Sequence, residues 1–384
     1  MNSDLKIFTP HKIGNLVIKN RIVRSATYMG SGDKNGAITD RTISIYDELA
    51  KNEIGLIMSG YMYVNKNGEA APHQLGIHKD KLVNPLKKLV SVVKEHDTTF
   101  FAQIAHGGRQ ILPYLATDKD VVAPSPIPDK LMKVIPREMT EVDIMNCIMD
   151  FISATIRVYQ AGFDGVQLHC AHGYLLSLFM SPYCNIRTDS YGGSIDNRLR
   201  IIQKIIIGIQ DEIGKEFPIA VKMNVADFVK EEPQLTIDES KIFAKKMVKL
   251  GVCAIEPSAG LYETAMIGNF TASRVKIKTE DDEAYFLPEA KIIKKEIGEI
   301  PIILVGGIRS RSVAEKVINE GMDFISISRP LIREPDLITK WKNNISSKAD
   351  CISCVRCLLE PTPKGVICHP LKKILRKQKQ MKVK

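Results

Sequence analysis

Short apolar runs rich in β-branched residues recur along this chain, separated by stretches of helix length. They are residues 20–26, 55–61, 99–105, 165–170, 219–224, 254–260, 301–307 and 324–330. The runs are continuously apolar instead of alternating, which is typical of parallel strands buried on both faces. Eight repeats of strand and helix favour a closed barrel over an open doubly wound sheet. The sequence therefore predicts an α/β protein with a single (β/α)₈ (TIM) barrel and a short C-terminal extension that contains cysteines.

Two of the intervening stretches carry recognisable helix signals. Thr140 and Asp143 are spaced as in a capping box, and apolar residues then recur on one face until Gly162. Residues 313–318 predict a shorter amphipathic helix that stops near Gly321. No low-complexity linker and no second unit long enough to fold alone interrupts this pattern.

The formal net charge of +10 is concentrated at one end of the chain. The last fourteen residues hold seven basic side chains and no acid, so subtracting these seven leaves the rest at only +3. We interpret this tail as solvated, with binding to an acidic partner or an anionic surface as the alternative, and expect no nucleic-acid partner. No apolar run reaches the roughly 18 residues of a membrane span, and the N-terminus lacks a signal-peptide pattern. The expectation is a cytoplasmic enzyme.

The residues that end the eight runs are the candidates for function, because active sites in such barrels lie at the carboxyl ends of the strands. At or near these ends lie Ser25, Ala26, Thr27, Gly60, Gln103, His169, His172, Tyr174, Lys222, Glu256, Ser258, Gly306, Gly307, Ser328 and Arg329. Taken singly, each has a structural explanation as a solvated, paired or core side chain. The two histidines also have a spacing that suits metal ligands or hydrogen-bond donors to a substrate oxygen.

The last two runs together predict a phosphate site. Gly306 and Gly307 follow the seventh run, and Ser328 and Arg329 close the eighth. Loops after these strands frequently bind phosphate through backbone N–H groups, and an arginine adds charge-assisted hydrogen bonds. We expect a phosphorylated cofactor or substrate here. The nearest approach to a dinucleotide fingerprint, in residues 30–36, has its third glycine one place too far along.

Three stretches, in order, resemble the old yellow enzyme family, and the resemblance extends from about residue 7 to 340. They are KNRIVRSAT (19–27), HCAHGYLLSLFMSPYCNIRTDSYGGSIDNRLR (169–200) and VGGIRSRSVAEKVINEGMDFISISRPLIREPDL (305–337). The resemblance implies FMN lying across the barrel mouth, with NADH or NADPH as the reductant. Ser25-Ala26 departs from the Pro-Met often found in the first turn, and Cys170 lies where a smaller residue is common.

By position, the resemblance assigns cofactor contacts to the ends of several strands. Contacts to the flavin ring are assigned to Ser25, Ala26, Thr27, Gly60, Gln103 and Lys222, and contacts to the phosphate to Gly306, Gly307, Ser328 and Arg329. Lys222 replaces the usual arginine beside N1 and O2 of the flavin. A cation there stabilises the anionic reduced flavin, and lysine imposes less geometric constraint than arginine.

The same resemblance assigns the catalytic roles. His169 and His172 match the pair that binds the substrate carbonyl oxygen and polarises the conjugated C=C bond, and Tyr174 matches the proton donor. Hydride from flavin N5 then completes the NAD(P)H-dependent reduction of an α,β-unsaturated carbonyl compound. Two alternatives stay open: a dienoyl-thioester reductase or amine demethylase-like subunit, and a non-catalytic electron carrier. An RNA-modifying FMN barrel fits neither the histidines nor the tyrosine.

Four cysteines lie close together in the extension, in the pattern C-x₂-C-x₂-C-x₁₀-C. They are Cys351, Cys354, Cys357 and Cys368. In a chain without a secretion signal this spacing favours a metal over disulfides, and an iron–sulfur cluster, zinc or free thiols are open. The pattern is similar to the segment that holds a [4Fe–4S] cluster in 2,4-dienoyl-CoA reductase and trimethylamine dehydrogenase. We therefore expect a barrel over residues 1–340, an extension over 341–384, and either an electron-donating partner subunit or a homo-oligomer.

Overall fold

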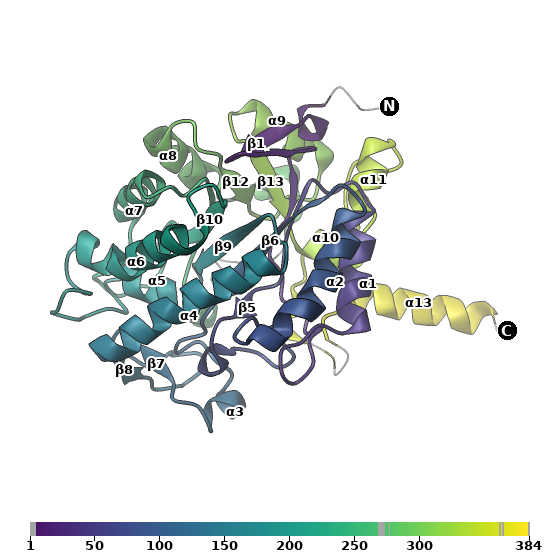
Figure 1. The fold of residues 1–384 in the computed structure, drawn as a ribbon. Coiled ribbons are helices and arrows are strands. Elements are labelled where there is room, and N and C mark those ends of the chain that lie inside the picture. The colour runs from purple at the N-terminus through teal and green to yellow at the C-terminus, as the bar shows by residue number, and fades with distance from the viewer. Residues whose placement is uncertain (1–4, 268–272, 276, 361, 363–364, 383–384) are drawn as a thin grey trace.

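Eight parallel strands form the barrel in the computed structural model, which describes residues 5–267, 273–275, 277–360, 362 and 365–382 (Figure 1). The barrel strands are β3 (Ile22–Arg24), β4 (Leu56–Met58), β6 (Thr99–Ala105), β9 (Gly165–Cys170), β10 (Ile219–Asn224), β11 (Ala254–Ser258), β12 (Ile303–Val305) and β13 (Phe324–Ile327). They are hydrogen-bonded in the order β11-β10-β9-β6-β4-β3-β13-β12. A parallel bridge between Ile255 and Ile302 joins the two ends of this sheet and closes the barrel. Each strand lies within one of the eight predicted runs, so the predicted fold class is confirmed.

Helices follow the strands along the chain and surround the barrel (Figure 1). They are α1 (Asp40–Ala50), α2 (Val83–Lys94), α4 (Glu141–Gln160), α6 (Ile195–Ile213), α7 (Ile237–Lys249), α8 (Leu287–Ile297), α9 (Arg311–Asn319), α10 (Arg329–Arg333) and α11 (Leu337–Lys342). The predicted capping box begins α4. The Thr140 side chain accepts a hydrogen bond from the Asp143 backbone N–H, and the Asp143 carboxylate accepts one from the Thr140 backbone N–H. Eight residues of α4 are buried, because its apolar stripe faces the barrel.

Further strands and α-helices accompany the barrel. They are β1 (His11–Ile13), β2 (Leu16–Ile18), β5 (Met62–Tyr63), α3 (Pro113–Ala116), β7 (Val122–Ala123), β8 (Arg137–Glu138), α5 (Leu175–Met180), α12 (Arg356–Leu359) and α13 (His369–Lys382). Strands β1 and β2 pair as an antiparallel hairpin, and their buried Ile13 and Ile18 join the apolar cluster inside the barrel. The hairpin thus covers the end of the barrel opposite the carboxyl ends of the strands.

The barrel interior changes from apolar to polar along its axis. Its apolar layer contains Val23, Phe101, Ala220 and Phe324, and Gly165 leaves the space that the Phe101 ring fills, since a Cβ there would lie 2.5 Å from the ring. Alternate residues of a strand point the same way. Two residues further along β3, β6, β9, β10, β11 and β13, the side chains on this face are therefore the polar ones of Ser25, Gln103, Gln167, Lys222, Glu256 and Ser326. The sequence thus builds an apolar base beneath a polar mouth.

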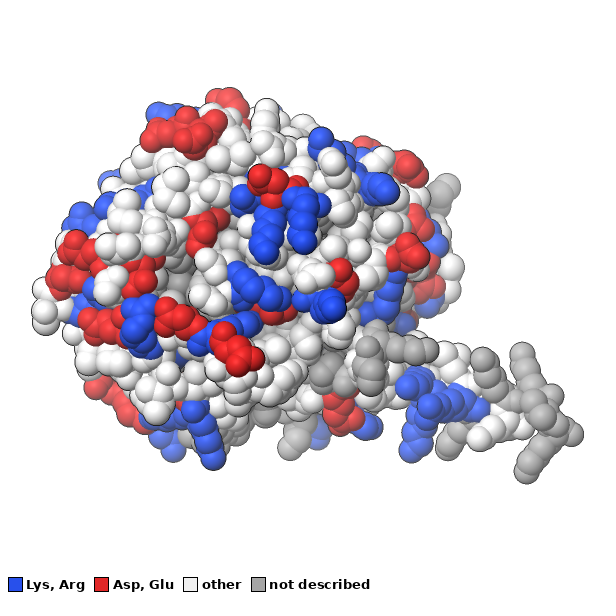
Figure 2. Space-filling model, turned by 60° about the horizontal axis from the view of Figure 1, so that its bottom comes forward, with Lys and Arg blue, Asp and Glu red and all other residues white. Residues whose placement is uncertain are grey.

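The C-terminal helix α13 projects from the barrel, and its described lysines and arginine form a basic surface in Figure 2. Elsewhere on the face shown, acidic and basic side chains are interspersed. Ile374 and Leu375 on this helix are also about half exposed. Among the described helices, none combines the length and the hydropathy needed to span a bilayer.

Candidate active site

A cavity of about 210 Å³ opens at the carboxyl ends of the strands. Nine of the predicted site residues line it: Ser25, Ala26, Thr27, Gln103, His169, His172, Tyr174, Lys222 and Ser328. Ser258, another strand-end candidate, lines the cavity too, and the structure also brings Tyr28, Tyr61, Gln110, Tyr262 and Leu358 to it. Residues far apart in the sequence therefore meet at one site because parallel strands end at the same edge of the barrel.

The floor of this cavity is a polar network. Lys222 on β10 donates to Ser25 Oγ and to Glu256 Oε1, both at 3.1 Å. Gln103 on β6 donates to Gln167 Oε1 at 2.7 Å, and these two residues are directly opposite each other in the β6–β9 register. All five side chains are buried. The cavity thus offers a lysine cation and a glutamine amide to a flat polar ligand.

His169 and His172 lie side by side at the end of β9, with ring centroids 5.2 Å apart. Burial and the nearby Lys222 charge lower the pKa of His172 to about 3, and burial lowers that of His169 well below its ordinary value. Both rings are therefore neutral at pH 7. The Ala171 backbone N–H donates to His169 Nδ1 at 3.3 Å, which leaves the ring proton on Nε2. His172 Nε2 lies 2.6 Å from Ser258 Oγ, and a left-handed backbone (φ +67°) orients this residue.

Tyr174 lies against the same histidines, with its ring centroid 4.7 Å from that of His169 and 5.1 Å from that of Tyr61. Burial raises the pKa of Tyr174 to about 12, although hydrogen bonds from Tyr61 and Gln110 oppose the rise. The phenol is therefore protonated at neutral pH and available as a proton donor beside the two imidazoles.

Gly60 lies beneath the first turn of the site. A Cβ at this position would lie 2.8 Å from the Thr27 carbonyl oxygen, so a side chain here would displace that turn. The Gly60 backbone N–H donates to Tyr46 at 2.6 Å, and Thr27 Oγ1 lies 2.8 Å from Ser328 Oγ. The first bond holds the end of β4 against α1, and the second joins the ends of β3 and β13.

The predicted phosphate residues adjoin the cavity on the β12–β13 side. Gly306 and Gly307 both have positive φ, and a Cβ on Gly307 would lie 2.7 Å from the Tyr285 ring. Arg329 is buried, and its Nη1 has no hydrogen-bond partner among the described residues. A buried cationic N–H without an acceptor is costly, so this atom fits an anionic ligand.

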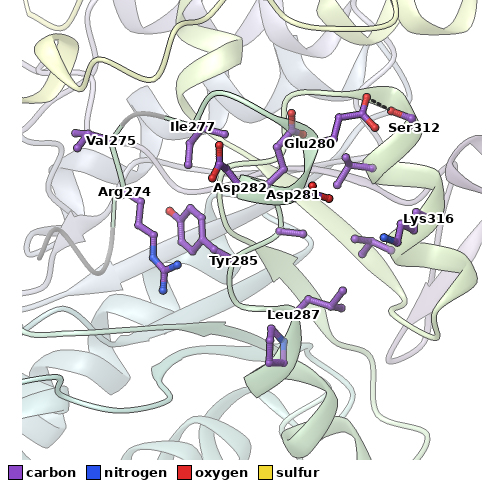
Figure 3. A pocket seen from close by; sticks show the side chains of 15 residues that line it. Arg274, Val275, Ile277, Glu280, Asp281, Asp282, Tyr285, Leu287, Ser312 and Lys316 are labelled. Carbon is purple, nitrogen blue, oxygen red and sulfur yellow. Dashed lines mark hydrogen bonds between the residues drawn. The ribbon is translucent and has the colours of Figure 1, made fainter.

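A larger cavity of about 580 Å³ lies outside the barrel mouth, between residues 274–288 and α9 (Figure 3). It shares no lining residue with the mouth cavity. Its lining includes Glu280, Asp281 and Asp282, and the Arg274 guanidinium lies 4.6 Å from the centre of the Tyr285 ring. No histidine is among the described residues that line this cavity, whereas two histidines line the mouth cavity together with Tyr174 and Lys222.

The four cysteines of the extension line one small cavity of about 20 Å³, together with Arg329 and Arg333. Arg329 thus lies between the phosphate side of the mouth and the cysteines. Leu358, the neighbour of Cys357, lines the mouth itself. Among the described residues, no group of three or more His, Cys, Asp or Glu side chains is arranged to hold a single metal ion.

The sequence analysis did not assign two groups of residues to the site: the strand residues Gln167 and Glu256, and the cavity residues Tyr61, Gln110 and Tyr262. Gln167 carried a usable signal, because a glutamine inside an apolar strand is costly without a polar partner. Glu256 was recognised as a strand end but not as part of the site. Tyr61 is the last residue of the run 55–61 but was not singled out. Gln110 lies in a loop and Tyr262 begins a short 3₁₀-helix, where no periodicity shows which way a side chain faces.

Polar side chains gathered over an apolar base at the carboxyl ends of eight parallel strands define the class: a (β/α)₈-barrel enzyme. The particular family is also shown. The chain belongs to the NADH:flavin oxidoreductase / NADH oxidase family, which matches residues 6–348. The predicted membership of the old yellow enzyme family is thereby confirmed.

Individual relatives differ in how much of their length the chain covers. It is 36% identical to an NADPH dehydrogenase of Bacillus cytotoxicus and covers 91% of that protein with 87% of its own residues. It is also 36% identical to an NADH oxidase of Thermoanaerobacter brockii, but 91% of the chain covers only 52% of that protein. A solved structure of a 2-naphthoyl-CoA reductase superposes with a TM-score of 0.81 at 28% identity, over 90% of this chain and 53% of the other. The chain thus spans about half the length of the latter two.

Proposed function

We propose that this chain is an FMN-dependent ene-reductase that reduces the C=C bond of an α,β-unsaturated carbonyl compound with NADH or NADPH. The observation that carries the proposal is the grouping of His169, His172 and Tyr174 on one side of a cavity whose floor holds Lys222. Two neutral hydrogen-bond donors, a protonated phenol and a cation are the groups that this reaction requires.

The flavin-binding residues are assigned by fit. The residues that line the mouth and would contact the ring are Lys222, Gln103, Thr27, Ser25 and Ala26. Gly60 lies behind them and allows the close approach of the Thr27 carbonyl group. Gly306, Gly307, Ser328 and Arg329 would hold the phosphate, a role that the unpartnered Arg329 Nη1 supports. When bound, FMN supplies the hydride.

The residues of the chain account for the remaining steps. The His169 Nε2–H would donate to the carbonyl oxygen of the substrate. His172 lies beside it, and because its Nε2 pairs with Ser258 Oγ, its hydrogen bond to the substrate would come from Nδ1–H, with the Ser258 hydroxyl donating to Nε2. These bonds stabilise the negative charge that develops on this oxygen, and both imidazoles do so as neutral donors. Tyr174 then gives its phenolic proton to the carbon next to the carbonyl group.

The cysteines favour a narrower version of the same function, a dienoyl- or other unsaturated-thioester reductase with a [4Fe–4S] cluster. The four thiols surround one cavity, which Arg329 also lines, and Cys357 precedes Leu358, a residue of the mouth. This arrangement suits a cluster that would pass electrons to the mouth. The likeness to a 2-naphthoyl-CoA reductase supports a thioester substrate. In this version residues 1–340 form the catalytic barrel, residues 341–384 hold the cluster, and an electron-donating partner subunit is expected.

The test is an absorption spectrum of anaerobically purified protein, with iron and sulfide assayed on the same sample. Flavin bands, together with NAD(P)H oxidation that depends on cyclohexenone, are expected. Iron at about four per chain would add the cluster, and faster turnover of an enoyl thioester than of the ketone would select the narrower function. Failure to bind FMN even after reconstitution would overturn the proposal.

A further inference from the structure

Glu256 lies one layer below the mouth, fully buried, and does not line the cavity itself. Its carboxylate nevertheless collects four hydrogen bonds from four different strands or strand ends. Oε1 accepts from Ser25 Oγ at 2.8 Å, Lys222 Nζ at 3.1 Å and Ser326 Oγ at 3.0 Å. Oε2 accepts from Gln167 Nε2 at 2.9 Å. A buried carboxylate with this many donors is satisfied, and it ties the layer of polar side chains together.

The first consequence concerns the direction of two amides. An ionised carboxylate only accepts hydrogen bonds, so Glu256 requires that Gln167 point its NH₂ group toward it. Gln167 then presents its Oε1 to Gln103, whose NH₂ group donates to it at 2.7 Å. Gln103 lines the cavity, and its amide carbonyl is thereby left free to accept from a ligand. Glu256 thus determines, through one intermediate residue, which polar group the site presents.

The second consequence concerns charge. Lys222 and Glu256 form an ion pair at 3.1 Å, with side chains 6% and 0% exposed. The lysine lines the cavity and the glutamate does not, so the pair presents its positive end to a ligand and keeps its negative end one layer deeper. At such burial the field of the carboxylate is poorly screened and offsets part of the lysine charge.

We propose that Glu256 is a positioning residue of the flavin site, whose carboxylate sets the relative affinity of the site for oxidised and reduced FMN. This inference rests on the proposed function, because it concerns the bound flavin. Lys222 alone would favour the anionic reduced flavin; Glu256 moderates that preference and fixes the Gln103 amide at the same time. The flavin therefore meets a lysine whose charge is partly offset by Glu256, and not an isolated cation.

The experiment compares the wild type with Glu256→Gln, Lys222→Gln and the double variant, measuring the midpoint potential of bound FMN against a reference dye and the Kd for oxidised FMN. Glu256→Gln is expected to raise the ratio of oxidised to reduced Kd about tenfold, which corresponds to ~30 mV for a two-electron couple. Lys222→Gln is expected to lower the ratio, and the double variant to return toward the wild type. Ser326→Ala, which removes one hydrogen bond to Glu256 and no charge, is the matched control and is expected to stay within about twofold.

An unchanged ratio in Glu256→Gln, or a shift in the same direction as in Lys222→Gln, would overturn the inference while leaving FMN binding intact. If Glu256→Gln does not fold, the double variant decides, since it replaces the ion pair by a neutral one of similar size. A double variant with a higher ratio than Lys222→Gln supports the inference, and one with the same ratio refutes it. A wild type that binds no FMN removes the proposed function itself, which is a different result.

Discussion

The Arg109 guanidinium donates to Glu263 Oε1 at 3.1 Å, and both side chains are at most 3% exposed. The same guanidinium donates to the Ile127 and Pro128 carbonyls. The pair thus joins the loop after β6 to the segment that carries Tyr262, a residue of the mouth. Removing one partner of a buried pair leaves the other charge uncompensated.

We predict that Glu263→Gln lowers the free energy of unfolding by about 3–5 kcal/mol, because Arg109 is left buried without its counter-charge. Urea unfolding followed by circular dichroism measures this. The matched control is Glu320→Gln, which breaks the solvent-exposed pairs with Lys291 at 2.6 Å and with Lys316 at 4.0 Å and is expected to cost about 0–1 kcal/mol. Equal losses in both variants would show that burial of the pair contributes nothing.

The strands of this protein could be predicted from the sequence because each is buried on both faces, which leaves a continuous apolar run. The short strands β5, β7 and β8 and the β1–β2 hairpin could not, since two or three residues carry no periodicity. Their positions depend on contacts with distant parts of the chain, such as the pairing of Met62 with Ile104.

The site was predictable in part for the same reason. Strand ends identify His169 and Lys222, because all strand ends meet at the mouth. Glu256 and Gln167 required the register: only the pairing of Lys222 with Glu256 and of Gln103 with Gln167 on adjacent strands shows that one network joins them. Spacing along a single chain does not contain that information.

Tyr174→Phe is predicted to slow alkene reduction by about 10²–10⁴-fold, the usual contribution of a positioned proton donor. Reduction of the flavin by NAD(P)H should be nearly unchanged, because the phenol has no part in it. Stopped-flow measurement of the two half-reactions separates these effects. The control is Tyr61→Phe, which removes the hydroxyl of the neighbouring tyrosine, whose ring centroid lies 5.1 Å from that of Tyr174. This variant should slow alkene reduction less than Tyr174→Phe.

The pH dependence of alkene reduction gives a second check on Tyr174. Because its pKa is raised to about 12, the Tyr174 phenol remains protonated throughout the neutral and mildly alkaline range. The rate of the alkene half-reaction should therefore show no loss from this group up to about pH 10. A decline centred near pH 8 that disappears in Tyr174→Phe would contradict the assignment.

Buried histidines are predicted to make the fold sensitive to acid. Burial lowers the pKa of His106 to about 4 and that of His172 to about 3. Because these folded-state values lie below the unfolded value near 6.5, unfolding takes up protons as the pH falls. Their contribution to stability is complete above about pH 6.5 and is lost progressively toward pH 4, by ~1.4 kcal/mol per pH unit for each histidine.

His106→Asn tests this sign, since it removes the titrating group and keeps an acceptor near the position of Nδ1, which the Gly108 backbone N–H contacts at 3.1 Å. Urea unfolding between pH 4 and 7 should show a slope reduced by ~1.4 kcal/mol per pH unit. A slope in His106→Asn equal to that of the wild type would be incompatible with a neutral, buried His106.

Cys354→Ser is predicted to lower the iron content from about four per chain to near zero, because a [4Fe–4S] cluster needs four thiolates. FMN content should be retained, since Cys354 lines the cysteine cavity and not the mouth. Cys253→Ser, at a half-buried barrel cysteine outside the cluster, is the control and should keep its iron. Zinc in place of iron in the wild type, lost in the same variant, would instead make the site structural.

Gly307→Ala is predicted to weaken FMN binding at least about tenfold. A methyl group at this position lies 2.7 Å from the Tyr285 ring, and its backbone has φ +75°, so the change forces both a steric displacement and an unfavourable conformation. Gly321→Ala is the matched control: its φ is +98°, but nothing lies within 4 Å of the new Cβ. Both variants should lose about 1–2 kcal/mol of stability from the backbone strain. Only Gly307→Ala should also lose FMN affinity, measured by quenching of flavin fluorescence, because only there does Tyr285 shift beside Arg329. Equal FMN affinity in the two variants would place the phosphate elsewhere.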